Sequence, residues 1–77
     1  MMKELIEQIA KSIVEEPDEV QVRAIEGEHA VVIELRVDRD DIGKVIGKQG
    51  RTISAMRTIL NAARAQKEKR HILEVIE

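Results

Sequence analysis

The feature that most constrains the fold is a four-residue segment with glycine at both ends, Gly47-Lys48-Gln49-Gly50 (the glycine loop), which lies between two helix-like stretches. Glycine adopts backbone angles closed to other residues and lets another backbone approach closely. The loop therefore predicts a tight turn that an external group approaches. The residues after it, 51–65, favour a helix, and the amides of its first turn would point back toward the loop and attract an anion.

Positive side chains gather around this turn, at Lys44, Lys48 and Arg51. A cation in the first turn of a helix, such as Arg51, is unfavourable by about 0.3–1 kcal/mol, and a bound anion would offset that cost. Gly43, inside the short helix expected before the loop, costs roughly 0.5–1 kcal/mol relative to alanine. Either close approach of a nucleic-acid backbone or close packing of this helix on its neighbour would explain the glycine.

The distribution of charge points to the same region. The net charge of −2 by itself disfavours a polyanionic partner, but residues 1–42 carry five basic and twelve acidic residues, whereas residues 43–77 carry eight basic and three acidic residues. A polyanion responds to the local field, and the positive half contains the loop. For the basic run from Arg64 to Arg70, the alternative to contact with a nucleic acid is a solvated helix face.

Length and composition bound the rest. Seventy-seven residues allow one domain with a small core, which oligomerisation would supplement. The chain has no cysteine and no long apolar run, so we expect a cytoplasmic protein without disulfides or thiolate metal sites. It also has no Phe, Tyr or Trp, which disfavours readers of RNA that stack bases on aromatic rings. The absence of these rings does not disfavour a loop that holds the backbone of a nucleic acid.

Periodicity predicts the first half of the fold. An amphipathic helix is expected over residues 2–15, and Pro17 ends it because proline cannot continue a helix. Alternating apolar residues predict strands over 19–25 and 30–37, which a turn joins as an antiparallel hairpin. In that turn we expect Gly27 at positive φ and His29 in solvent.

The second half is expected to begin with a short helix from Asp41 to Ile46, which nearby aspartates offer to cap. A longer helix follows from Arg51 to about Gln66, with its apolar residues facing inward: Ile53, Met56, Ile59, Leu60 and Ala63. A last strand, residues 71–76, alternates little, which indicates burial on both faces or at an interface.

Enzymatic chemistry finds little support. Residues 43–48 resemble a P-loop only loosely, because three residues separate the glycines and Gln49 stands where Ser or Thr would hold magnesium. The serines, Ser12 and Ser54, fall on helices and away from both histidines in sequence. The acidic run from Asp38 to Asp41 lacks the further ligands of a calcium loop. We expect no enzyme, no metal and no cofactor.

The octapeptide from Ile46 to Ile53 resembles the signature of the KH domain, whose Gly-x-x-Gly loop joins two helices and clamps about four unpaired nucleotides. The order helix, strand, strand, helix, helix, strand resembles the type II KH arrangement. This implies an α+β fold with a three-stranded mixed sheet, three helices on one face, and a last strand parallel to the central one. Residues 1–77 would form a single KH domain, with 1–28 as an N-terminal helix-strand extension and 29–77 as the core β-α-α-β motif.

The domain size, residues 17–20, Gly27 and the run 43–51 make the chain similar to the KhpA family of small bacterial single-KH-domain proteins. The resemblance implies a cytoplasmic protein that binds single-stranded RNA as an RNA chaperone or post-transcriptional regulator, with a role in cell envelope growth, cell wall biogenesis and cell shape. It also implies a homodimer, or a heterodimer with a larger KH-containing partner, KhpB. No membrane or small-molecule substrate is expected. The implied RNA-binding residues are Gly43, Lys44, Gly47, Lys48, Gln49, Gly50 and Arg51.

Two alternatives use the same fold: a non-catalytic protein-protein interaction module, and a factor that attaches to structured ribosomal RNA during assembly. Degenerate KH domains usually lose the loop pattern or its basic residue, and this chain keeps both, which favours RNA over protein docking. The role of Lys67, Lys69 and Arg70 stays open, because Glu68 interrupts that basic connection.

Overall fold

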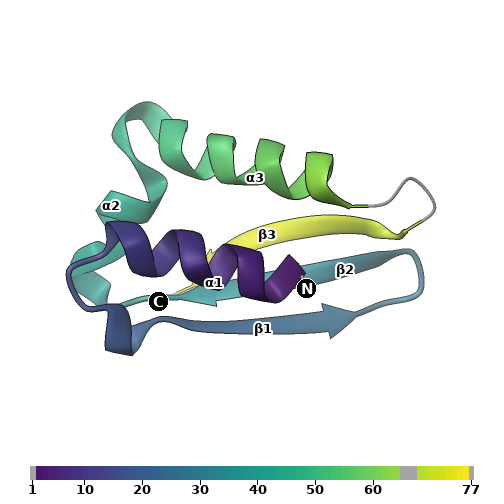
Figure 1. Cartoon of the computed structure of the whole chain (residues 1–77), viewed down its shortest axis with the longest axis horizontal. Coiled ribbons are helices and arrows are strands. Elements are labelled where there is room, and N and C mark those ends of the chain that lie inside the picture. The colour runs from purple at the N-terminus through teal and green to yellow at the C-terminus, as the bar shows by residue number, and fades with distance from the viewer. Residues whose placement is uncertain (1, 65–67, 77) are drawn as a thin grey trace.

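The computed structural model of the chain describes residues 2–64 and 68–76. In this part of the chain three α-helices lie against one face of a three-stranded sheet (Figure 1). The helices are α1 (Met2–Ile13), α2 (Ile42–Ile46) and α3 (Arg51–Ala63), and the strands are β1 (Gln21–Glu26), β2 (Ala30–Arg36) and β3 (Arg70–Ile76). Short 3-10 turns lie at Pro17–Glu19, Arg39–Asp41 and Lys48–Gly50. The expected α+β order is confirmed.

The sheet has the expected mixed topology, in the order β1-β2-β3. β1 and β2 form an antiparallel hairpin in which Val22 lies opposite Leu35, and β2 pairs in parallel with β3 so that Ile33 lies opposite Leu73. Because parallel neighbours need a crossover connection, α2 and α3 together carry the chain back across the sheet. This crossover places the glycine loop, between α2 and α3, at one end of the molecule (Figure 1).

The core lies between the helices and the covered face of the sheet. Side chains that are fully buried come from every α-helix and from β2 and β3: Ile6, Ala10, Ile33, Leu35, Val45, Met56, Leu60 and Leu73. The apolar stripe predicted for the first helix packs here through Ile6 and Ala10. At about 25 cal/mol per Å² of apolar surface removed from water, burial of this set is the main stabilising term of the fold.

The last strand differs from the expectation. Its burial alternates, with His71 and Leu73 facing the helices and Ile72 and Glu74 exposed on the opposite face. The expectation that the last strand is buried on both faces is therefore wrong for the single chain, because the helices cover only one face of the sheet (Figure 1). Whether Ile72, which is 38% exposed, lies at an interface stays a prediction.

Three further expectations are corrected. Ile59 and Ala63 of α3 do not point inward: both are exposed, Ile59 by 44%, because the inward stripe of this helix narrows to Ile53, Met56 and Leu60. Gly27 is not at positive φ. Its N–H instead donates to Ala30 O at 2.8 Å, and a Cβ on Gly27 would lie 3.0 Å from the same oxygen.

The predicted boundaries shift slightly. The first helix ends at Ile13 and its continuation to residue 15 is wrong. The last turn predicted for the second long helix, at Ala65 and Gln66, lies outside the described residues. His29 is exposed, as expected, and its Nε2 lies 3.6 Å from Glu28 Oε1.

Candidate nucleic-acid interface

The glycine loop has a backbone that requires glycine. Gly47 has φ 77° and ψ 169°, a region populated essentially by glycine alone, and it ends α2 by donating its N–H to Gly43 O at 2.9 Å. Gly50 is left-handed, with φ 73° and ψ 16°, and its N–H donates to Gly47 O at 3.0 Å. Between them Gln49 also has positive φ, 56°, which is uncommon for a residue with a side chain. The loop is thus a sharp bend with conformational strain at its tip.

The surroundings of the glycines give Gly47 a different role from Gly43 and Gly50. A Cβ on Gly47 would lie 2.2 Å from Thr52 Oγ1, so the close approach that glycine allows here is internal to the chain. A Cβ on Gly43 or Gly50 would meet nothing within 4 Å. Packing of the short helix on its neighbour therefore does not explain Gly43. Of the two explanations for Gly43, close approach of an external group therefore remains, because the surface over this glycine is open.

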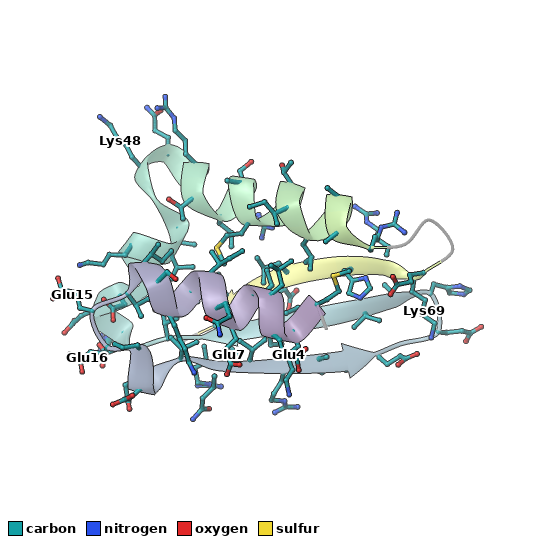
Figure 2. The ribbon with its side chains drawn as sticks, in the orientation of Figure 1. Glu4, Glu7, Glu15, Glu16, Lys48 and Lys69 are labelled. Atoms are coloured by element: carbon teal, nitrogen blue, oxygen red, sulfur yellow. The ribbon has the colours of Figure 1, made fainter. Side chains whose placement is uncertain are left out.

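The side chains of the loop project away from the fold (Figure 2). Lys48 and Gln49 are exposed, and Arg51 donates from Nη2 to Gln49 Oε1 at 3.2 Å. No side chain caps the start of α3. The bend thus presents two cations beside the uncapped start of a helix, where the helix dipole is positive.

Lys44 differs from the other predicted cations, because its Nζ lies 3.3 Å from Glu15 Oε1. Both side chains are largely exposed, so this ion pair is worth at most about 1 kcal/mol. The carboxylate of Glu15 therefore reduces the positive field that Lys44 would otherwise present. Lys44 is available to an anion only in competition with Glu15.

Asp41 fixes the position of α2 in a way that the sequence did not predict. It is 2% exposed, and its carboxylate oxygens accept hydrogen bonds from the N–H groups of Glu15 at 3.1 Å and Glu16 at 3.0 Å. The expected cap at the start of this segment comes from Asp38, which accepts from Asp40 N–H at 2.9 Å. Asp41 makes no cap on α2 and instead ties the end of α1 to the helix that carries the loop.

A hollow beside the loop helix was also missed. It lies between α3 and the edge strand β3, has a volume of about 240 Å³, and is lined by residues that include Arg57, Asn61 and Leu73. Arg57 donates from Nε and Nη2 to Leu73 O, at 3.3 and 3.0 Å, and so bridges the helix to the strand. The helical spacing of Arg57 and Asn61, four residues apart, was the available signal.

The basic connection after α3 is partly engaged. Lys69 donates to Glu26 Oε2 at 2.9 Å and to Gly27 O at 2.8 Å, so it fastens the start of β3 to the β1-β2 turn. Arg70 is exposed at the start of β3, and Lys67 lies outside the described residues. Lys69 therefore contributes to the fold at the end of α3 remote from the glycine loop.

Comparison with known proteins gives a clear match. The model of the KhpA/KhpB KH domain matches residues 3–75. The chain belongs to the KhpA/KhpB family of KH domains. Among curated relatives, the RNA-binding protein KhpA of Clostridium acetobutylicum is 52% identical over 75 residues, which cover 97% of this chain and all of the relative. KhpA of Aquifex aeolicus is 53% identical over 76 residues, 99% of this chain and 96% of the relative.

Membership in the KhpA/KhpB family confirms the suspected resemblance, and the mixed sheet with its helices on one face agrees with the KH fold. These relatives are named for RNA binding and not for a reaction, in agreement with the expectation that the chain is not an enzyme. In residues 2–64 and 68–76 no cluster of three or more metal-ligating side chains occurs. No helix in that part of the chain has the length and hydropathy to cross a membrane.

Proposed function

We propose that the chain binds single-stranded RNA through the glycine loop. The observation that carries the proposal is the geometry of the bend, with two glycines at positive φ, Lys48 and Gln49 exposed at its tip, and open space over Gly43 and Gly50. The names of the relatives support RNA as the ligand. The residues that would contact RNA are Gly43, Lys44, Gly47, Lys48, Gln49, Gly50 and Arg51.

In this mechanism the bend and the start of α3 receive the phosphates. Lys48 and Arg51 supply charge, and the two open glycines, Gly43 and Gly50, leave room for the sugar-phosphate backbone. The bases would lie over the hollow between α3 and β3, where Arg57 offers the donors that Leu73 O does not use. Without aromatic residues, base contacts would be aliphatic and polar, so sequence preference would be weak.

Fluorescence anisotropy with a short unpaired RNA tests the proposal. The double substitution Lys48→Asp/Gln49→Asp should weaken binding by about tenfold or more, because it removes a phosphate contact and adds repulsion. Aspartate tolerates the left-handed conformation of position 49, so the fold should persist. A matched control, Gln8→Asp/Lys11→Asp on exposed positions of α1, makes the same change in net charge and should leave most of the affinity.

Equal affinity of the parent and the loop variant, with both folded by circular dichroism, would favour the protein-docking module instead. The salt dependence gives a second check, since log K should fall with log[salt] by about 0.7 per neutralised phosphate. A folded, structured ribosomal RNA fragment that binds more tightly than the unpaired RNA would favour an assembly factor.

The finer functions implied by the resemblance to the KhpA family remain part of the proposal: an RNA chaperone or post-transcriptional regulator in the cytoplasm, with a role in envelope growth and cell shape. Self-association, or pairing with a larger KH-containing protein such as KhpB, would raise affinity through effective concentration if both loops reached one strand. Light scattering distinguishes a monomer from a dimer, and co-purification with KhpB tests the second arrangement.

A further inference from the structure

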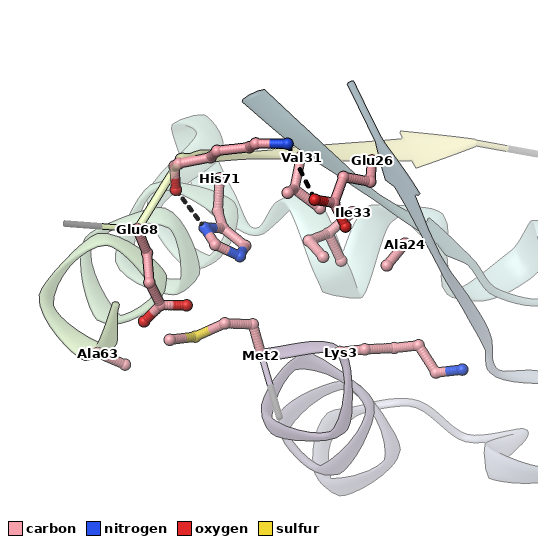
Figure 3. A pocket seen from close by; sticks show the side chains of 10 residues that line it. Met2, Lys3, Ala24, Glu26, Val31, Ile33, Ala63, Glu68 and His71 are labelled. Carbon is pink, nitrogen blue, oxygen red and sulfur yellow. Dashed lines mark hydrogen bonds and ion pairs between the residues drawn. The ribbon is translucent and has the colours of Figure 1, made fainter. Parts of the chain in front are cut away.

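A larger hollow lies between the start of α1, the end of α3 and the sheet, at the opposite end of α3 from the glycine loop (Figure 3). Its volume is about 610 Å³, which is in the range of sites for small ligands. The apolar part of its wall is entirely aliphatic and comes from two helices and two strands: Met2, Ala24, Val31, Ile33 and Ala63. An apolar ring would fit such a wall, and methionine makes favourable contacts with aromatic rings through its sulfur.

His71 places one polar atom in this apolar setting. The residue is 9% exposed, and its Nδ1 lies 2.8 Å from Lys69 O. A carbonyl oxygen accepts hydrogen bonds, so Nδ1 carries the proton and Nε2 of the neutral ring is an acceptor. Nε2 has no hydrogen-bond partner among the described residues, and the ring faces the hollow. An unpartnered acceptor at the wall of the hollow suits a ligand that brings an N–H or O–H donor.

The charges that the described residues place around the rim balance one another and so do not favour a strongly ionic ligand. Lys69 and Glu26 pair at 2.9 Å, and the other two charged residues of the lining, among those that the structure describes, are Lys3 and Glu68. Two cations and two anions give no net formal charge. A phosphate or a carboxylate would therefore gain little here, whereas a neutral ring would lose little on leaving water.

We propose that this hollow binds the side-chain ring of a tryptophan or tyrosine from a partner polypeptide, with the indole N–H or phenol O–H donated to His71 Nε2. The chain contains no Phe, Tyr or Trp and so cannot fill the hollow with such a ring of its own. Tryptophan and tyrosine are the residues that most often anchor protein interfaces in such pockets, since they join a large apolar area to one donor.

The position of the hollow adds a functional consequence. α3 has 13 residues, a length of about 20 Å at 1.5 Å per residue, and it separates the hollow from the glycine loop. A partner anchored at the hollow would leave the loop open. RNA and the partner would then bind the same chain together without competing for a surface.

Nuclear magnetic resonance titration of the full chain with N-acetyl-tryptophanamide tests the proposal. We expect saturable shifts at His71, Val31 and Ala63, with none at the glycine loop. N-acetyl-phenylalaninamide, a ring without a donor, should bind about fivefold more weakly, the usual value of one neutral hydrogen bond. N-acetyl-leucinamide should bind more weakly still.

Two substitutions locate the site. His71→Asn keeps a donor near the place of Nδ1 but removes the acceptor at Nε2, so it should bring the tryptophan amide to the affinity of the phenylalanine amide. Ala63→Met would fill the hollow from an exposed position and should abolish the shifts. Ala55→Met, at an exposed position of α3 outside the lining, is the matched control and should leave binding unchanged.

The proposal is overturned if the parent chain, with a well-dispersed spectrum, shows no saturable shifts with the tryptophan amide. It is equally overturned if Ala63→Met leaves these shifts intact. It is also overturned if uridine or adenosine binds the hollow more tightly than the tryptophan amide, which would make the hollow a nucleobase site. RNA binding measured on Ala63→Met should equal that of the parent, so failure at the hollow is distinct from failure at the loop.

Discussion

At the start of α3, the glycine loop is shaped by residues that are neighbours in sequence, whereas at its end the larger hollow is closed by contacts such as that of Lys69 with Glu26, 43 positions apart. The loop exposes its side chains, and the hollow encloses His71 among aliphatic groups. One end therefore depends on backbone conformation and the other on the docking of distant segments. Substitutions at the two ends should therefore change stability or binding for different physical reasons.

The largest effect is expected from Gly47→Ala. The new Cβ would meet Thr52 Oγ1 at 2.2 Å in a backbone region closed to alanine, so we expect a loss of about 3 kcal/mol in the free energy of unfolding by urea. Gly50→Ala, where a Cβ meets open space, should cost only about 1–2 kcal/mol for the left-handed backbone. Equal losses would contradict the separation of roles between the two glycines.

Asp41→Ala tests a long-range contact that positions the loop end. It removes the acceptor of two backbone N–H groups and should lower the free energy of unfolding by about 2 kcal/mol. Asp40→Ala, at an exposed neighbouring position, should stay within about 0.5 kcal/mol of the parent. If the two variants unfold alike, the loop end does not depend on this carboxylate.

Gly43→Ala should move two measurements in opposite directions. Alanine in the helix, with nothing within 4 Å of its Cβ, should raise the free energy of unfolding by about 0.5–1 kcal/mol. The same methyl group should weaken RNA binding in the anisotropy assay if the sugar-phosphate backbone approaches this surface. A stabilised variant with unchanged affinity would remove Gly43 from the proposed interface.

Glu15→Gln sharpens the role of Lys44. The substitution releases Lys44 from its ion pair, so RNA affinity at low salt should rise by about twofold, and the gain should shrink as salt increases. Glu7→Gln, which releases Lys11 on α1, is the control and should change affinity less. A fall in affinity on releasing Lys44 would mean that Glu15 holds it in the productive position.

The smallest effect is expected at the remote end of α3. The hydrogen bond from Lys69, followed by its charge, lowers the pKa of Glu26 below its usual value of 4.5. A lowered folded-state pKa stabilises the fold above the unfolded pKa, and the benefit is lost as the pH falls through the folded value. Thermal unfolding should therefore show the parent slightly more stable than Glu26→Gln at pH 7, with the difference vanishing well below pH 4.5. A difference that persists where this carboxyl is protonated in the folded state as well would point to another cause.

Most of the fold follows from local pattern. The first two strands, the helices and the loop between two of them were predicted because alternation, helical spacing and paired glycines are read within a few residues. The parallel pairing of the last strand was instead implied by the resemblance to the type II KH arrangement. The errors at Ile59, Ala63 and β3 share one reason: periodicity identifies an apolar face but not how much of it a small core covers. Which side chains touch RNA, and the division into residues 1–28 and 29–77, stay predictions.

The amino-acid sequence by itself determined the bend and its charges, because the conformational freedom of Gly47 and Gly50 and the cations beside them are properties of adjacent residues. Tertiary structure alone decided that Asp41 reaches back to Glu15 and Glu16, that Lys44 is paired, and that His71 faces an apolar hollow. Each of these depends on where the crossover places segments far apart in the chain. Local backbone preferences do not specify which distant segments of the chain come together.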